Sequence, residues 1–271
     1  MFDEFAYHES LVHPALLRVA ASGQVPRKVF IGGGGELATA REVLRHTTVE
    51  EVVMVDLDEK VVKLCQKLMP EWGGDDVANN PRLKLIFGDA HKYLMETKEQ
   101  FDVIIMDISD PVEAGPGIAL YTKEFYDHAV KLLSPHGVFV TQSGMADAIP
   151  YKIVDKDSPD CMAFGPIRNT LASVFDQALP YTTHIPSFGG DWGFVMACTP
   201  QETNGHTINW KVPSTELIDK LIEQQIEGGS KSLRHYDGEG HHKMFALTKP
   251  LRAYLASEDR IMTKENPIYM F

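Results

Sequence analysis

The feature that most constrains the fold is the alternation of short apolar runs with amphipathic stretches along residues 28–199. The runs have the length of buried strands, and several stretches between them repeat apolar residues every three or four positions, as helices do. We expect strands at 28–31, 52–56, 83–87, 101–107, 137–142, 182–187 and 194–199, and helices at 36–46, 58–69, 121–133 and 161–178. This order predicts a doubly wound α/β fold, in which helices cover both faces of a seven-stranded parallel sheet.

The pattern weakens near residue 201, and we expect the domain organisation to follow it. Residues 1–200 are predicted to form the main domain, and residues 201–271 an appendage packed on it. Within the appendage, only residues 214–227 have helical character.

Charge and composition exclude several classes of protein. Lys and Arg number 26 against 38 Asp and Glu, and the net charge of −12 disfavours nucleic acid and anionic membranes while it favours cationic ligands. No apolar run reaches the ~18 residues of a membrane span, and the acidic first residues do not resemble a signal peptide. Three widely spaced cysteines indicate a reducing compartment. We therefore expect a cytoplasmic protein with no nucleic-acid or membrane partner.

A glycine-rich loop joins the first predicted strand to the first predicted helix. The glycines of residues 32–35 allow a backbone to approach a ligand closely, and Glu36 follows them directly. The loop lacks the G-x-G-x-x-G pattern of pyrophosphate binders, and a carboxylate at its end repels phosphate and suits a cationic group. An equally good interpretation is that Glu36 complements the dipole at a helix start.

Single carboxylates follow the next two predicted strands. Asp56 stands 20 residues beyond Glu36, where an acid accepts hydrogen bonds from ribose hydroxyls in nucleotide sites, and we favour this role over a plain turn. Asp89 can accept from an adenine amino group. As an isolated residue, however, it is better explained as the cap of a helix that begins at Ala90.

The densest acidic cluster, Asp107 and Asp110, follows the fourth predicted strand. Ligands of such sheets bind at the carboxyl ends of the strands, so we favour a cationic ligand here over an Asp-Pro turn with solvated acids. A metal site is not expected. His8 and His13 only superficially resemble a zinc-protease helix, because a spacing of five puts them on different helix faces.

In combination, these motifs resemble the polyamine aminopropyltransferase family, the group that contains the spermidine synthases. The resemblance covers residues 3–199 and is strongest to its thermospermine synthase branch. It rests on Asp3-Glu4-Phe5-Ala6-Tyr7-His8-Glu9, Gly33-Gly34-Gly35-Glu36, Asp56-Leu57-Asp58, Gly88-Asp89-Ala90, Asp107-Ile108-Ser109-Asp110-Pro111, Gln142 and Ile185-Pro186-Ser187-Phe188.

The resemblance implies a Rossmann-like fold with a methyltransferase-type sheet. It also implies an enzyme that moves an aminopropyl group from decarboxylated S-adenosylmethionine to a polyamine and releases 5′-methylthioadenosine. The expected acceptor is spermidine and the product thermospermine. No cofactor beyond this co-substrate is implied, and the expected assembly is a homodimer or homotetramer.

By the same resemblance, Asp107 is the acid–base residue with Tyr7 assisting, and Asp110 holds the acceptor's ammonium group. The rest of the acceptor site is implied to be Tyr7, Gln142 and Phe188. The implied donor-binding residues are His8, Gly33, Gly35, Glu36, Asp56, Asp89 and Ala90. Because an aspartate of ordinary pKa (~4) is a poor base for an amine, we expect Asp107 mainly to orient the amine's lone pair.

Three departures from the family pattern leave alternatives open. Leu37 replaces a glycine that is common after the acidic loop residue, and Phe188 replaces a tyrosine that contacts putrescine in spermidine synthases. The family's N-terminal β-strand domain is largely missing before Tyr7. The alternatives are a spermidine or spermine synthase, an S-adenosylmethionine methyltransferase of the same fold, and an inactive truncated chain that only binds ligand.

Overall fold

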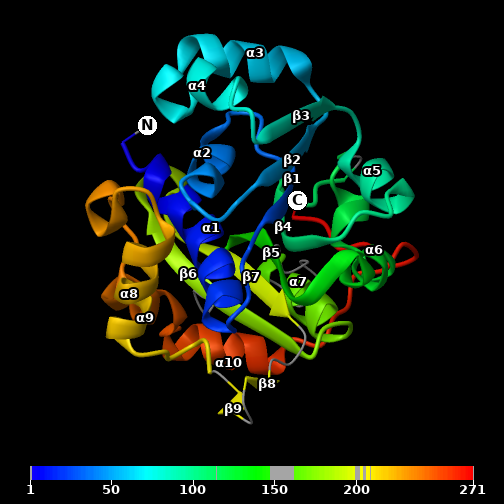
Figure 1. The fold of residues 1–271 in the computed structure, drawn as a ribbon. Helices are drawn as coiled ribbons and strands as arrows, with labels where there is room; N and C mark the ends of the chain where they lie inside the picture. Colours follow the sequence, from blue (N-terminus) through cyan, green and yellow to red (C-terminus); the bar gives the residue numbers. More distant parts are fainter. Residues whose placement is uncertain are drawn as a thin grey trace.

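The computed structural model describes residues 2–113, 115–146, 162–198, 202–203, 206–207 and 209–270. Its centre is a seven-stranded sheet in the order β3-β2-β1-β4-β5-β7-β6 (Figure 1). The strands are β1 (Lys28–Gly33), β2 (Glu51–Asp56), β3 (Leu83–Phe87), β4 (Phe101–Asp107), β5 (Leu133–Met145), β6 (Gln177–Ile185) and β7 (Gly190–Cys198). A separate two-stranded hairpin consists of β8 (Glu202–Thr203) and β9 (His206–Thr207). The sheet confirms the predicted doubly wound α/β fold.

Helices cover both faces of the sheet (Figure 1). Each face has its own hydrophobic core. The first face carries α1 (Glu4–Ala21), α2 (Ala38–Leu44), α3 (Glu59–Leu68), α4 (Gly74–Ala78), α8 (Thr215–Gln225) and α9 (Gly238–Phe245). The second face carries α5 (Ala90–Glu96), α6 (Lys123–Ala129), α7 (Phe164–Ala172) and α10 (Lys249–Ser257). Short 3-10 turns are η1 (Pro70–Trp72), η2 (Ile118–Tyr121), η3 (Val130–Leu132), η4 (Pro186–Phe188) and η5 (Gly229–Ser232).

The central strands are apolar throughout because both of their faces are buried. In β1, Val29 and Ile31 enter the core under α1, whereas Phe30 points to the other face and packs on Tyr93 and Phe101. Val29, Phe30 and Ile31 are fully buried, and each such side chain stabilises the fold by about 1.5–3 kcal/mol. A strand of this kind forms a continuous apolar run in the sequence rather than an alternating one.

The parallel pairing places the predicted carboxylates at one edge of the sheet. Gly33, at the end of β1, is in register with Asp107, at the end of β4. Asp56, at the end of β2, is in register with Phe87, two residues before Asp89. The loops that carry the candidate ligand-binding residues therefore meet beyond the same ends of the strands.

The expectation of an all-parallel sheet is wrong for β7, which pairs antiparallel with both β5 and β6. The connection between β6 and β7 is only η4 followed by Gly189, which has a φ of 87°. A parallel crossover needs a dozen or more residues, so a link this short forces a hairpin.

Several predicted boundaries also shift. The helix predicted at 121–133 begins at Lys123 and ends at Ala129; the 3-10 turn η3 follows it, and β5 begins at Leu133. The helix predicted at 161–178 ends at Ala172, and its first residue lies outside the described residues, as does residue 199 of the last predicted strand.

The described part of the C-terminal segment packs on both faces of the sheet. Ile218 and Phe245 belong to the core under α1, and Leu251 belongs to the opposite core. The domain boundary at residue 200 stays a prediction. None of the helices described is both long and apolar enough to cross a membrane.

Candidate active site

Two cavities lie at the carboxyl edge of the sheet, and Asp107 lines both of them. Their volumes are about 320 Å³ and about 170 Å³. The larger cavity is lined by Glu4, Tyr7, His8, Glu36, Trp72, Asp107, Ile185, Ser187 and Phe188. The smaller cavity is lined by Gly33, Val55, Asp56, Leu57, Asp89, Ala90, Asp107, Ile108, Ser109, Pro116, Gly117 and Leu120. The larger cavity is thus lined by acidic and aromatic side chains, and the smaller one by the carboxylates of Asp56 and Asp89. The carboxylate of Asp107 is common to both cavities.

Asp107 is the last residue of β4, and both of its carboxylate oxygens accept hydrogen bonds. The Tyr7 hydroxyl donates to Oδ1 at 2.6 Å, and the Thr39 hydroxyl donates to Oδ2 at 2.5 Å. Burial raises the pKa of Asp107 to about 6; negative Glu36 adds to this rise, and His8 and the two hydrogen bonds oppose it. This pKa is above the ~4 of an ordinary aspartate, so Asp107 is a better proton acceptor near neutral pH than we expected.

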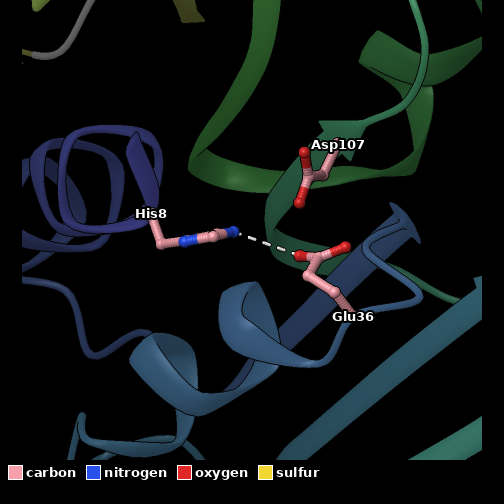
Figure 2. Close-up of side chains that lie close together, drawn as sticks. All are labelled: His8, Glu36 and Asp107. Atoms are coloured by element: carbon pink, nitrogen blue, oxygen red, sulfur yellow. Dashed lines mark hydrogen bonds and ion pairs between the residues drawn. The ribbon is translucent and has the colours of Figure 1, made fainter. Parts of the chain in front are cut away.

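His8, on α1, is held between two carboxylates. Its Nδ1 lies 2.7 Å from the Glu4 carbonyl oxygen and 3.0 Å from Glu4 Oε2. Its Nε2 lies 3.1 Å from Glu36 Oε1, the contact drawn in Figure 2. Because every partner is an acceptor, His8 donates from both ring nitrogens and is positively charged. Burial alone lowers the pKa of His8, but the hydrogen bonds to Glu36 and Glu4 outweigh burial and raise it to about 10.

His13 lies on the same helix but faces another part of the molecule. Its Nδ1 is 3.0 Å from His46 Nε2, and its Nε2 is 3.3 Å from Glu42 Oε2. The prediction that His8 and His13 do not share a site is therefore confirmed.

The glycine loop needs its glycines for close approach. Gly33 has a φ of +82°, and a Cβ there would lie 2.1 Å from the carbonyl oxygen of Asp107. A Cβ on Gly35 would lie 2.8 Å from Asp56 Oδ2. Leu37 has a φ of 75°, in the left-handed region that favours glycine, so this position is unfavourable for a leucine and would suit a glycine.

Asp56 and Asp89 occupy the smaller cavity in different ways. Asp56 Oδ1 accepts a hydrogen bond from the backbone of Asp58 at 2.8 Å, and burial raises the pKa of Asp56. Asp89 Oδ1 accepts from the backbone nitrogens of His91 and Lys92, which confirms it as the cap of α5. Asp89 also lines the cavity, so capping and ligand binding are compatible.

A family model described as the spermine/spermidine synthase domain matches residues 4–207. The chain belongs to this family. It is 40% identical over 270 residues to a polyamine aminopropyltransferase of Hyperthermus butylicus, with 100% of this chain and 80% of that protein covered. It is 39% identical over 265 residues to a thermospermine synthase of Arabidopsis thaliana, with 97% of this chain and 70% of that protein covered.

A crystal structure of a spermidine synthase in complex with the transition-state analogue AdoDATO has the same fold. It matches 94% of this aminopropyltransferase and 76% of its own chain with a TM-score of 0.74, at 28% sequence identity. Together, the comparisons confirm the predicted family, the enzyme class and the Rossmann-like fold of the methyltransferase type.

Most of the predicted site residues of this aminopropyltransferase line one of the two cavities. Those in the larger cavity are Tyr7, His8, Glu36, Asp107 and Phe188. Those in the smaller cavity are Gly33, Asp56, Asp89, Ala90 and Asp107. Gly35 lies beside them against Asp56. The Phe188 ring contacts the rings of Tyr7 and Trp192, with centroids 5.8 Å and 4.6 Å apart.

Asp110 and Gln142 are not among the residues that line these two cavities. The Gln142 amide nitrogen donates to Asp110 Oδ1 at 3.0 Å and to the Tyr121 hydroxyl at 2.9 Å. Its amide oxygen accepts from Trp192 Nε1 at 3.2 Å. Gln142 thus fixes the side chains of Asp110 and Trp192 by hydrogen bonds. The contact of Asp110 and Gln142 with the acceptor stays a prediction.

Residue-by-residue reasoning on the sequence did not assign a role to several residues of this site. Glu4 and Ser187 stand inside the quoted family motifs, which is the signal that could have found them. Trp72 is a cavity wall, one of the two roles that the sequence suggests for a tryptophan. Thr39 has no such signal, because its contact with Asp107 exists only once the fold brings the start of α2 to the end of β4.

Proposed function

We propose that this aminopropyltransferase moves an aminopropyl group from decarboxylated S-adenosylmethionine to spermidine, producing thermospermine and 5′-methylthioadenosine. The observation that carries the proposal is the position of Asp107, which lines both cavities at once. A sulfonium is already a good leaving group, so the proposed reaction needs no further cofactor. The work of the protein is to hold an amine against the reacting carbon.

The donor's nucleoside is assigned to the smaller cavity. Asp56 accepts hydrogen bonds from the ribose hydroxyls, and Asp89 and Ala90 lie beside the adenine. The aminopropyl arm passes Asp107 and directs its ammonium group to Glu36. The same carboxylate repels the carboxylate of ordinary S-adenosylmethionine, so Glu36 supports the choice of the decarboxylated donor.

The acceptor is assigned to the larger cavity. Asp107 attracts the reacting amine, Asp110 is proposed to hold a further ammonium group, and the rings of Trp72 and Phe188 pack against the methylene segments. Amines of pKa ~10 arrive protonated, so the reacting nitrogen must lose a proton first.

In the proposed step, Asp107 accepts a proton from the amine and Tyr7 holds the carboxylate in place. The nitrogen lone pair forms the new N–C bond at the propyl carbon as the C–S bond breaks. The electron pair of that bond goes to sulfur, which leaves as neutral 5′-methylthioadenosine.

The identity of the acceptor is supported by the similarity to the Arabidopsis thaliana thermospermine synthase and by Phe188 at the cavity wall. Chromatography of the product against authentic spermidine, spermine and thermospermine tests it directly. If the product is spermidine made from putrescine, or spermine made from spermidine, that product replaces thermospermine in the proposal.

The Asp107→Asn variant tests the proposed chemistry. We expect it to lose nearly all release of 5′-methylthioadenosine, while it binds added 5′-methylthioadenosine almost as tightly as the wild type in calorimetry. Asp127→Asn, the same change on the surface of α6, is the matched control and should keep full activity. Full activity of Asp107→Asn contradicts the assignment, and tighter binding of the carboxylated donor would contradict the proposed choice of the decarboxylated one.

We also propose a cytoplasmic enzyme that assembles as a homodimer or homotetramer and binds neither nucleic acid nor membranes. The net charge of −12 supports the lack of affinity for polyanions. Light scattering of the purified chain tests the assembly, and a monomer would contradict it.

A further inference from the structure

His8, Glu36 and Asp107 bring three metal-binding groups together in the larger cavity. One ring nitrogen and one oxygen from each carboxylate lie within 4.8 Å of one another, and the three side chains converge from α1, the glycine loop and β4 (Figure 2). Among the His, Cys, Asp and Glu side chains that the structure describes, no other three come together in this way. One imidazole with two carboxylates suits Zn²⁺ and neighbouring transition-metal ions better than Mg²⁺ or Ca²⁺, which prefer oxygen ligands alone.

The surroundings of His8 present the correct nitrogen to such an ion. Nδ1 is occupied by the carbonyl and carboxylate oxygens of Glu4, so Nε2 is the atom that faces Glu36. Histidine ligands of metals almost always donate their other ring N–H to a carboxylate or backbone carbonyl, and Glu4 supplies both. The imidazole is therefore oriented by groups outside the three candidate ligands.

Asp107 is supported in a similar way. The hydroxyls of Tyr7 and Thr39 each occupy one position on its two oxygens and leave further lone pairs free to bind an ion. Ligating carboxylates usually have such outer hydrogen bonds. The site thus has three ligands, outer partners for two of them, and a cavity through which an ion can enter.

The distances require only a small adjustment to close around an ion. Zn²⁺ binds nitrogen and oxygen ligands at about 2.0–2.2 Å, so tetrahedral ligand atoms lie roughly 3.3 Å apart. His8 Nε2 and Glu36 Oε1 are already 3.1 Å apart. The Asp107 oxygen lies within 4.8 Å of both atoms, and a rotation of the Asp107 and Glu36 carboxylates, the latter on a side chain that is 24% exposed, would close the remaining gap.

We propose that His8, Glu36 and Asp107 form a binding site for a transition-metal dication such as Zn²⁺, and that a bound ion inhibits the enzyme. The ion takes the place of the proton on His8 Nε2, and its double positive charge compensates the two carboxylates. It occupies the space assigned to the donor's ammonium group and engages the carboxylate assigned to the proton transfer. Only the inhibition rests on the proposed function; the binding does not.

The test is a titration of metal-free protein with Zn²⁺ in competition with a fluorescent zinc chelator. We expect one tight Zn²⁺ site per chain, and at least a tenfold weaker affinity in both His8→Gln and Glu36→Gln. His184→Gln is the matched control, because His184 also pairs with a carboxylate, Asp191, at 3.0 Å but lies exposed outside the cavity. Its affinity for Zn²⁺ should equal that of the wild type.

Unchanged affinity in the two cavity variants, or no stoichiometric site in the wild type, overturns the proposal. Circular dichroism checks that the variants fold. If His8→Gln does not fold, because His8 is buried, the Glu36→Gln variant decides alone. The same titration with activity as the readout should show inhibition that the chelator reverses. If the chain has no aminopropyltransferase activity at all, the Zn²⁺ titration still decides whether the metal site exists.

Discussion

Thr39→Val is expected to shift the acid limb of the pH–rate profile to higher pH. Thr39 is fully buried, and its hydroxyl donates to Asp107 Oδ2 at 2.5 Å. Valine has almost the same shape but cannot donate this hydrogen bond. Because the bond stabilises the ionised carboxylate, its loss should raise the pKa of Asp107 above its present value of about 6.

The size of the shift follows from the strength of the lost bond. A hydrogen bond to a charged group contributes about 1.5–3 kcal/mol, and one pKa unit corresponds to 1.36 kcal/mol, so the pKa of Asp107 should rise by about 1–2 units. At pH 7 the ionised fraction of Asp107 would then fall from about nine-tenths to between about one-half and about one-tenth. We therefore expect the rate at pH 7 to fall by about two- to tenfold and to recover near pH 9.

The assay is the initial rate of 5′-methylthioadenosine release at saturating donor and acceptor, measured from acidic to alkaline pH for wild type and variant together. Thr170→Val is the matched control, because Thr170 is an equally buried threonine whose hydroxyl bonds to the backbone of Pro166 at 2.7 Å. Its acid limb should not move. An unshifted limb in Thr39→Val, or a loss of rate that is the same at every pH, would refute the reasoning.

Three further outcomes are expected. Glu36→Gln should raise the donor's dissociation constant in calorimetry at least tenfold and leave that of 5′-methylthioadenosine unchanged, whereas equal losses for both ligands would contradict the ammonium assignment. Burial raises the pKa of Glu42, but His13 and two arginines outweigh burial and lower this pKa to about 2. The ionised Glu42 therefore contributes fully to the stability of the fold above pH 4.5, and this contribution is lost as the pH falls towards 2. In urea titrations, Glu42→Gln should therefore lower the free energy of unfolding at pH 7 by about 3–5 kcal/mol, and the gap to wild type should close in acid; a gap independent of pH would contradict this. Gly33→Ala should displace Asp107 and reduce turnover about a hundredfold, with Gly88→Ala, whose Cβ meets nothing within 4 Å, as a nearly neutral control.

Local sequence patterns were sufficient for the four parallel strands β1 to β4 and, to within two residues, for the places where they end. The runs at 29–31 and 103–106 are apolar because the strands that contain them are buried on both faces, and only a sheet covered on both sides accommodates such runs repeatedly. The carboxylates that follow these strands could be recognised for the same reason, because parallel strands bring their carboxyl ends to one edge.

Helix α1 shows where local patterns fail. Leu11, Val12 and Leu16 are fully buried, but so are the polar Ser10 and His13, so the helix has no exposed face that would produce a periodic signal. Its burial under the sheet and the neighbouring helices is a property of the whole fold. The helix nevertheless supplies Tyr7 and His8 to the larger cavity.

The sequence by itself determined the α/β architecture, the family and the chemical types of side chain available at the edge of the sheet. Only the tertiary structure decided which of them act on one another, because the bonds that matter join residues far apart in the chain: His8 with Glu36, Thr39 with Asp107, and Tyr7 with Asp107, at separations of 28, 68 and 100 residues. It also decided their charge states. Burial and the fields of neighbours set a pKa, and neither exists until the chain has folded around the group.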